Sequence, residues 1–397
     1  MAEESRRRRA LLGCASILVA ALLWIPSVHF FFRVDAAPLL QDPGISPYSR
    51  ELAARHLDLW TDPAAREREL GGMRKSNAEW DFMGRTFLVL ALANMSLRDP
   101  AMKGPALEVI DRILEETLRL EALHGFYHFS MDYAKSRPYR REPARSQFVD
   151  NEVALMLAAR RLVGEKPEWK KALGERVDFI VEGMRSQPVL SAESYPDECW
   201  TFDNANALAA LRMADALDGT DHLPLCRAWL EGAKAKLVHK GTGILVSEYT
   251  LAGSTLDGPE GSSIWMVSHA LQLVDEDFAR DQYDRARREL RRRICGFDIS
   301  REWPVSVRGQ ADIDSGLVIP VIDASPGASG LALMGAAAFG DAEYLSGLLS
   351  SLEMAAFPLR SSGRLRYHAS NQVGDSALLY ATVLGPLWAE VKRRNGP

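Results

Sequence analysis

Apolar residues recur at three- and four-residue spacing along nearly the whole chain after residue 46, which predicts packed helices. The expected helices are Ser46–Trp60, Ala78–Arg98, Ala101–Leu123, Gln147–Val163, Glu168–Ser186, Phe202–Leu217, Leu223–Val238, Ser262–Val274, Asp277–Cys295, Ser325–Phe339, Ala342–Ala356 and Asp375–Arg394. Asp99-Pro100, Gly219 and Gly340-Asp341 mark ends of these segments. Only Gly243–Thr250 and Arg364–His368 have the pattern of strands.

About twelve helices that alternate between Ala-rich and more charged members favour an all-α fold, an (α/α)6 barrel of six inner and six outer helices. Inner helices are expected where polar residues are not explained by a solvated face, at Trp80–Asn94, Gln147–Ala159, Phe202–Met213 and Ser262–Leu273. Asp277–Arg293 carries a charged face typical of an outer helix. An irregular helical solenoid is the alternative.

The N-terminus has a different pattern. Arg6 to Arg9 precede the run Ala10–Phe32, which contains no Asp, Glu, Lys or Arg. A span of roughly 20 such residues crosses a bilayer core, and the arginines before it predict a cytoplasmic N-terminus. The length of the run favours an uncleaved signal anchor over a cleaved signal peptide, for which a weak cleavage site lies around Val34–Ala36.

The predicted organisation is a basic cytoplasmic tail (1–9), a transmembrane anchor (10–32), a linker (33–45) and an extracytoplasmic barrel (46–397), periplasmic in a Gram-negative cell. Almost no apolar core precedes the Leu-Leu-Gly-Cys sequence that ends at Cys14, which argues against lipidation. Cys199, Cys226 and Cys295 are exported in this scheme, and their odd number leaves at least one thiol unpaired unless chains are cross-linked.

Composition narrows the function. The chain has 397 residues, 47% hydrophobic and 25% charged, which excludes a disordered or low-complexity protein. Its net charge of −5 provides no electrostatic footprint for nucleic acid. Cysteine spacing indicates no structural metal site, and the motifs of nucleotide-binding proteins, zinc peptidases and α/β-hydrolases do not occur.

The sharpest chemical cluster is ESYPDECWTFDNAN, which leads directly into an apolar helix. Its candidate residues are Ser194, Tyr195, Asp197, Cys199, Trp200, Phe202, Asp203 and Asn204. A helix cap accounts for Asp203 or Asn204 alone, but not for the aromatic and acidic residues beside them. Aromatic walls with a few polar groups are typical of a buried small-molecule site.

A second cluster, FVDNE, stands at the head of another apolar helix. Glu152 lies just inside the apolar face, where an ionisable group is costly unless it is paired or functional. A buried carboxyl that is protonated near neutral pH is suited to act as a general acid. A structural, hydrogen-bonded glutamate is the alternative.

Three weaker candidates complete the set. Asp81 and Arg85 are four residues apart on one helix face. They form either an ion pair within the helix or a pocket in which the arginine holds the Asp81 carboxylate. Glu260 lies in a Gly-rich turn before an expected inner helix, with Ser262 as the expected cap. His128 is flanked by aromatic residues and is the best proton carrier among the histidines, with a core or loop histidine as the alternative.

Several stretches share their pattern with one known family. They are TFLVLALANMSLRDP from Thr86, ADALDGTDHLPLCRAWLEG from Ala214, GILVSEY, SSIWMVSHALQLVDEDFA, FGDAEYLSGLLSSLE and SGRLRYH. In this collinear pattern, from about Asp58 to Leu384, the chain resembles linalool dehydratase/isomerase. The resemblance implies an exported (α/α)6 barrel that forms a ring-shaped homo-oligomer. It also implies cofactor-free addition or removal of water at a tertiary allylic alcohol, in a pocket between subunits.

The same resemblance suggests site residues. Placed without gaps, the family's catalytic histidine falls at Glu152, and its two pocket cysteines fall at Ser194 and Asp203. Its catalytic aspartate corresponds to Asp58, unless the register shifts to His56. Asp81 is a further alternative for that aspartate. Carboxylates in place of histidine and cysteine indicate a substrate other than linalool.

The leading hypothesis is a membrane-anchored enzyme that performs acid/base chemistry on a hydroxylated small molecule such as a terpenoid alcohol. Glu152 and Asp203 would form the acid/base pair, because two nearby carboxylates push their pKa values apart. The expected supporting residues are Asp58, Asp81, Asp197, Glu260 and His128, with Tyr195, Trp200 and Phe202 as pocket walls. The alternatives are a glycoside-processing enzyme on the same toroid and a non-catalytic envelope protein that binds an isoprenoid or lipid.

Overall fold

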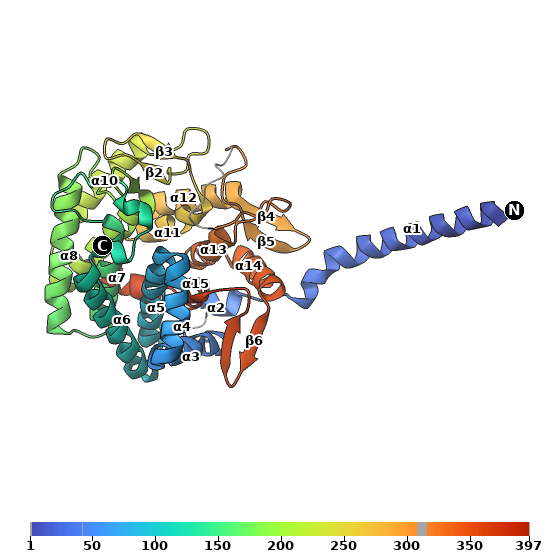
Figure 1. Ribbon diagram of the computed structural model, residues 1–397, viewed down its shortest axis with the longest axis horizontal. Helices are drawn as coiled ribbons and strands as arrows, with labels where there is room; N and C mark the ends of the chain where they lie inside the picture. The colour runs from blue at the N-terminus through green and yellow to red at the C-terminus, as the bar shows by residue number, and fades with distance from the viewer. Residues whose placement is uncertain (1, 42, 308–315, 397) are drawn as a thin grey trace.

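Six helices form a closed inner ring in the computed structural model, which describes residues 2–41, 43–307 and 316–396 (Figure 1). They are α5 (Ala78–Arg98), α7 (Gln147–Val163), α9 (Thr201–Asp218), α11 (Gly261–Leu271), α13 (Pro326–Ala338) and α15 (Gln372–Val383). Each inner helix packs against the next, and α15 packs against α5. The ring therefore closes, which excludes an open solenoid.

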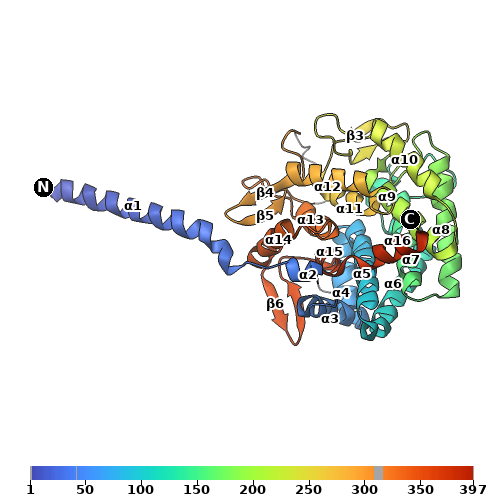
Figure 2. The same ribbon diagram turned by 180° about the vertical axis from the view of Figure 1, so that it is seen from behind.

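An outer layer surrounds this ring (Figures 1 and 2). Its helices are α3 (Pro47–Thr61), α6 (Lys103–His124), α8 (Pro167–Arg185), α10 (Leu223–Lys236), α12 (Glu276–Leu290) and α14 (Ala342–Ala355). Helices α6, α8, α12 and α14 each pack against the inner helix that precedes them, and α3 packs against α15 and α6. The predicted (α/α)6 barrel is thus confirmed.

The Ala-rich helices form the inner ring because a helix enclosed by neighbours must be apolar on every side. All residues of α7 are buried, from Gln147 to Val163. By contrast, α12 keeps a charged face toward solvent and buries only one stripe, which includes Ala279, Tyr283 and Ala286. The predicted assignment of inner and outer helices follows this difference.

Two further helices cover the barrel. Helix α4 (Pro63–Ser76), which the pattern did not predict, packs against α3 and α5. Helix α16 (Pro386–Asn395) lies against α5, α7 and α9. There the backbone N–H of Leu387 donates to Asn94 Oδ1 at 3.0 Å, close to the C-terminal end of α5. Helix α16 therefore covers the end of the barrel where the inner helices finish.

The last predicted helix, Asp375–Arg394, is in fact two helices. The chain breaks at Gly385, whose φ is 129°, and restarts at Pro386, the first residue of α16. A proline has no N–H to donate and clashes with the preceding turn, so a continuous helix through this position was the wrong expectation.

Extended structure is limited to short strands. A three-stranded antiparallel sheet contains β1 (Cys199–Trp200), β2 (Glu248–Tyr249) and β3 (Thr255–Asp257), with Cys199 opposite Tyr249. The hairpins are β4 (Arg291–Ile294) with β5 (Phe297–Ser300), and β6 (Pro358–Ser361) with β7 (Arg364–Tyr367). The strand expected at Gly243–Thr250 is reduced to β2, whereas that at Arg364–His368 appears as β7.

The helix expected to run to Cys295 ends at Leu290, and β4 follows it. Cys295 and Gly296 both have positive φ, 48° and 89°, between paired Ile294 and Phe297. Two such central residues form the tight turn that suits the twist of a hairpin, and this turn overrides the helical pattern of the preceding arginines. All four cysteines are free; Cys199 and Cys226 are buried.

The N-terminal helix α1 (Ala2–Ser27) projects away from the barrel (Figures 1 and 2). Within the described residues, the segment Glu3–Phe31 is long and apolar enough to cross a membrane, and its apolar window is not buried in the protein. A short helix, α2 (Ala37–Gln41), follows. Between them, the backbone N–H groups of Val34 and Ala36 donate to Ser350 Oγ and Ser346 Oγ of α14.

Candidate active site

The first turns of the inner helices gather at one end of the barrel. Each inner helix is followed by an outer helix that returns the chain, so all inner helices run in the same direction. Because α16 covers the opposite end, the polar residues near the starts of α7 and α9 lie toward the open end. Glu152 belongs to α7 and Asp203 to α9, which are neighbours in the ring.

Glu152 faces the interior of the barrel. Asp150, two residues earlier, forms an ion pair with Arg176 of the outer helix α8 at 2.6 Å. Two residues correspond to about 200° around a helix, so Glu152 lies on nearly the opposite face. Its electrostatic neighbours confirm this direction, since they include Thr86 of α5 and Asn206 of α9, the inner helices on either side of α7.

The environment of Glu152 favours its protonated form. The side chain has no exposed surface, and burial raises the pKa of its carboxyl to about 8. Thr86 and Asn206 oppose the rise by interacting with the ionised form, while the nearby carboxylate of Asp203 adds to it. Neither carboxyl oxygen has a partner at hydrogen-bond geometry among the described residues. Glu152 is therefore a buried acid with free donor and acceptor capacity.

Asp203 is the second carboxyl group of the site. Burial raises its pKa to about 7, and the nearby polar side chains of Ser194 and Asn151 lower it. The N-cap of α9 is Trp200, so Asp203 lies inside the first turn and makes no capping hydrogen bond. The capping interpretation is thus excluded. Repulsion between the two carboxylates opposes the ionisation of both at once.

We call Glu152, Asp203 and the polar side chains beside them the carboxylate cluster. Its other members are Thr86, Asn151, Ser194 and Asn206. Many of their buried polar atoms lack a hydrogen-bond partner among the described residues: Thr86 Oγ1, Asn151 Oδ1, Ser194 Oγ, and both amide atoms of Asn206. Buried polar groups are nearly always paired in proteins. So many unpaired groups at one place indicate that a polar ligand or water completes the cluster.

A further acidic group lies at the start of α11. Burial raises the pKa of Glu260 well above its usual value, and the neighbouring carboxylates of Glu302 and Asp257 add to this. Ser247 opposes the rise, and its backbone C=O accepts from the N–H of Thr201 at 2.8 Å. This contact links the acidic group to the first turn of α9, which also carries Asp203.

The carboxylate of Glu302 accepts hydrogen bonds at the start of α11, close to Glu260. It accepts the backbone N–H of Ser262 at 3.0 Å and a hydrogen bond from Ser325 Oγ at 2.5 Å. Ser262 is therefore not the cap of α11, as the sequence suggested; the N-cap is Glu260. Gly261 is required here, because a Cβ at this position would lie 2.2 Å from the carbonyl oxygen of Arg301.

Asp81 does not face the carboxylate cluster. It forms an ion pair with Arg85 at 3.2 Å, and the same guanidinium contacts Glu116 at 3.2 Å and Thr117 at 3.3 Å, both on the outer helix α6. Burial raises the pKa of Asp81, and Arg85 lowers it. In this geometry the carboxylate is occupied by an ion pair between the inner and outer layers, away from the carboxylate cluster.

Asp58 also lies away from the carboxylate cluster. Its side chain is 51% exposed on α3 and pairs with Arg364 of β7, on the outer layer. His56, the alternative for the same role, is buried with neither ring nitrogen paired, and burial lowers its pKa to about 3. Its nearest polar neighbours are Gln372 and the backbone at Asp375, not the carboxylate cluster.

Three predicted binding residues have structural roles instead. The side-chain amide of Asn204 hydrogen-bonds the backbone. It accepts from the N–H of Ala192 and donates to the carbonyls of Ala192 and Trp200. Tyr195 hydrogen-bonds Glu79 at the start of α5 and accepts the N–H of Met131. Asp197, with positive φ, pairs with Arg140 near the surface.

His128 lies outside the cluster as well. Its ring stacks on His124 at 5.0 Å between centroids. Burial lowers its pKa to about 4, and Arg74, His124 and Arg85 lower it further. A histidine among cations stays neutral and is poorly suited to carry a proton to the cluster.

The remaining predicted residues surround the first turn of α9. Cys199 is buried in β1, where burial and the carboxylates of Glu193 and Asp197 raise its pKa, so it is not a reactive thiolate. Phe202 is buried, and the indole N–H of Trp200 has no partner among the described residues. They remain candidates for the pocket wall.

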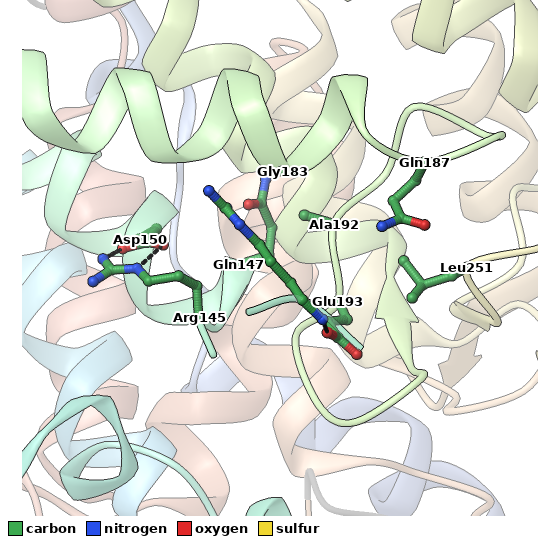
Figure 3. Close-up of a pocket in the computed structure, with 9 residues that line it drawn as sticks. Arg145, Gln147, Asp150, Gly183, Gln187, Ala192, Glu193 and Leu251 are labelled. Carbon is green, nitrogen blue, oxygen red and sulfur yellow. Dashed lines mark hydrogen bonds and ion pairs between the residues drawn. The ribbon is translucent and has the colours of Figure 1, made fainter. Parts of the chain in front are cut away.

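The cavity shown in Figure 3 lies between the start of α7 and the end of α8. Its volume is about 10 Å³, which is room for one water molecule at most. Arg145 and Asp150 line it and form a direct ion pair with each other. The cavity is therefore a structural feature and not a substrate site.

Sequence reasoning missed Thr86, Asn151, Asn206, Ser247 and Glu302. Asn151 and Asn206 stand inside the two polar clusters at the heads of α7 and α9, and Asn206 follows Asp203 by three residues, which places both on one helix face. That spacing was a usable signal. Glu302 lies in a loop far from α11 in sequence, and no local pattern connects the two.

A comparison with known protein families shows to which family the chain belongs. The linalool dehydratase/isomerase family model matches residues 150–373, more than half of the chain. The chain belongs to this family. The matched region contains Glu152, Asp203 and Glu260 but begins after Thr86. No curated protein matches the chain.

Solved structures with related helix arrangements are distant. A GH76 alpha-mannanase of Bacteroides thetaiotaomicron aligns with a TM-score of 0.46 and 12% identity, covering 76% of this chain and 84% of the mannanase. A polysaccharide lyase aligns with a TM-score of 0.37 and 12% identity, covering 78% of this chain and 99% of the lyase. The fold assignment rests on the closed helix ring and not on these two matches.

Proposed function

We propose that this member of the linalool dehydratase/isomerase family is a cofactor-independent carbon–oxygen lyase or isomerase that acts on a hydroxylated small molecule, such as a terpenoid alcohol. The observation that carries the proposal is the pair of buried, arginine-free carboxyls, Glu152 and Asp203, with pKa values of about 8 and 7. At neutral pH such a pair shares protons between an acid and a base, which dehydration requires.

The chemistry follows from these protonation states. Protonated Glu152 donates its proton to the substrate hydroxyl, the C–O bond breaks, and water leaves. Asp203 then takes a proton from the neighbouring carbon, and the C–H electron pair forms the double bond. Addition of water reverses both steps. The unpaired amide of Asn206 and hydroxyl of Thr86 are placed to hold the leaving or attacking water.

The enclosure of the cluster favours this reaction over sugar cleavage. Glu152 is fully buried and Asp203 is 4% exposed, so the two carboxyls do not line an open groove. A polymeric sugar needs such a groove on both sides of the bond to be cleaved, whereas a small, largely apolar alcohol fits an enclosed site. Exclusion of water also protects the cationic intermediate from premature capture.

The direct test compares Glu152→Gln with Asp150→Asn, a matched control two residues away on the same helix. The full chain is assayed against a panel of primary and tertiary allylic alcohols, including linalool, for consumption of alcohol and formation of diene. We expect Glu152→Gln to lose roughly 10³-fold or more in kcat, as loss of a general acid requires. Asp150→Asn keeps its turnover per folded molecule. Equal rates in wild type and Glu152→Gln would contradict the assignment.

We further propose that α1 anchors the barrel to a membrane, with the N-terminus in the cytoplasm. Support comes from the residues around the weak cleavage site: Val34 and Ala36 donate backbone hydrogen bonds to α14, and Ala36 is fully buried. Cleavage there would remove a segment that is packed into the barrel. Homo-oligomer formation is a proposal that rests on the family resemblance alone.

A further inference from the structure

A second cavity, of about 310 Å³, lies between the inner ring and the outer helices, beside the start of α15. Its main lining residues are Arg55, Glu69, Met73, Trp80, Arg366 and Asp375. None of them belongs to the carboxylate cluster. Trp80 precedes Thr86 by six residues on α5, a rise of about 9 Å along the helix. The volume lies at the lower end of the range for small-molecule sites, roughly 300–1,000 Å³.

The base of this cavity holds an unpaired acceptor. Asp375 is 4% exposed, and its Oδ1 is buried without a hydrogen-bond partner among the described residues. Leaving a buried acceptor unpaired destabilises the folded protein. A structure that keeps such an atom at the wall of a cavity indicates that a donor from outside the chain, such as a ligand hydroxyl, completes it.

The charges around the cavity cancel. Arg55 pairs with Glu69, and Gln372 Nε2 donates to the same carboxylate at 3.0 Å. Arg366 has no ion-pair partner within 4 Å among the described residues, and its charge acts through space on Asp375. Two arginines therefore face two carboxylates. A site with this balance provides no net field for an anion or a cation, but it provides both donors and acceptors.

Part of the lining is apolar. Trp80 presents an indole ring that is only partly buried, and Met73 lies beside it. Aromatic rings contribute large apolar contact surfaces to small-molecule sites. A ligand that fits must therefore combine an apolar face with an edge rich in groups that both donate and accept hydrogen bonds. Hydroxyl groups on a carbon ring have this property, because each one does both.

We propose that this cavity binds a neutral, polyhydroxylated small molecule, such as a pyranose sugar ring, with a ring face against Trp80 and hydroxyls on Asp375 and Arg366. This site is separate from the carboxylate cluster and needs no chemistry at Glu152. It is a binding site only, so it goes beyond the proposed function and does not depend on it.

The test uses the full chain in a detergent without a sugar headgroup, which would otherwise compete. Binding of methyl α-glucopyranoside, methyl α-mannopyranoside and myo-inositol is measured by saturation-transfer NMR with titration. At least one probe binds the wild type. Arg366→Ala, at an exposed position of β7, weakens that binding at least 5-fold, and Trp80→Leu weakens it as much. Arg364→Ala, at another exposed position of the same strand, leaves it within 2-fold.

Three outcomes would overturn the proposal: no probe binds, Arg366→Ala and Trp80→Leu bind as well as Arg364→Ala, or phosphate or tetramethylammonium displaces the polyol. The last outcome would assign the cavity to an ion. Glu152→Gln serves to separate this proposal from the proposed function. It retains polyol binding if the cavity is independent, whatever its effect on turnover.

Discussion

Asp150 and Glu152 stand two residues apart on α7, both are buried, and they have opposite surroundings. Asp150 meets Arg145 and Arg176 at the outer face of the helix. Glu152 meets a threonine, an asparagine and another carboxylate at the inner face, with no arginine among its electrostatic neighbours. The same contrast separates Asp81, which is held by Arg85, from Asp203. Between the layers, buried carboxylates are paired and structural; in the ring interior they are unpaired and available.

This difference provides a way to distinguish structural from functional carboxylates in such a barrel. Burial alone selects Asp81, Asp150, Glu152 and Asp203 equally. The presence of a cationic partner divides them. Asp81 and Asp150 are fixed in ion pairs with arginines, whereas burial without such a partner raises the pKa values of Glu152 and Asp203 to near neutral pH, where a carboxyl can exchange its proton. Family membership shows only that Glu152 and Asp203 lie within the matched region.

The largest expected effect concerns stability on the paired side. Asp150→Asn removes the shared partner of two arginines, so we expect the free energy of unfolding to fall by about 3 kcal/mol. Glu152→Gln keeps the shape and removes an acid that is costly to ionise, so it should be neutral or stabilising at pH 8. Chemical denaturation of both variants measures this. Equal losses would mean that the two carboxyls have the same structural role.

A slightly smaller effect is expected at Asp203. Asp203→Asn should lower kcat about 10²-fold, which corresponds to about 2.7 kcal/mol in the barrier. In the wild type, kcat/KM should rise with pH through about 7, as Asp203 ionises, and fall above about 8, as Glu152 loses its proton. Asp203→Asn should lose the rise below neutrality. A variant with an unchanged pH profile would remove Asp203 from the mechanism.

The pH dependence of stability gives a third test. The pKa of Glu152 is raised on folding, from about 4.5 to about 8, so the folded chain binds the extra proton between these values. Its contribution to stability is therefore complete below pH 4.5 and is lost as the pH rises to 8. We expect the wild type to lose more stability than Glu152→Gln over this range, by up to about 1.4 kcal/mol per pH unit. Parallel curves would show that Glu152 does not titrate in this window.

The smallest effect is expected at Thr86. Thr86→Val removes the hydroxyl that favours ionised Glu152 while keeping the shape of the side chain. The pKa of Glu152 should rise further, and the alkaline limb of the pH–rate profile should move upward by a fraction of a pH unit with a few-fold change in kcat. Ser96→Val, at a serine of the same helix that bonds its own backbone, is the control. A shift in both variants would indicate a general disturbance of α5.

Much of this arrangement could be predicted from the sequence. The apolar periodicity and the alternation of Ala-rich and charged helices determine the ring, and Glu152 stands out as an acid on an apolar helix. The hairpin at Cys295-Gly296 could not be predicted, because its arginines continue a helical pattern until the turn imposes strands. Sequence order also does not reveal that α3, which carries Asp58, lies outside the ring.

The side chains that approach the carboxyls could not be predicted from the sequence either. Thr86 and Asn206 approach Glu152 only because α5 and α9 are its neighbours in the closed ring, and Glu302 reaches Ser262 from a distant loop. Local pattern identifies a buried acid but not whether an arginine reaches it. That distinction separates Asp81 from Glu152.

The central claim is that Glu152 is a protonated acid at neutral pH in the resting protein. Infrared difference spectra of wild type minus Glu152→Gln, recorded from pH 6 to pH 9, test it directly. The account predicts the carbonyl band of a protonated carboxylic acid at pH 7, lost around pH 8 as the carboxylate band appears. Absence of the acid band at pH 7, with the carboxylate band already present, would contradict it.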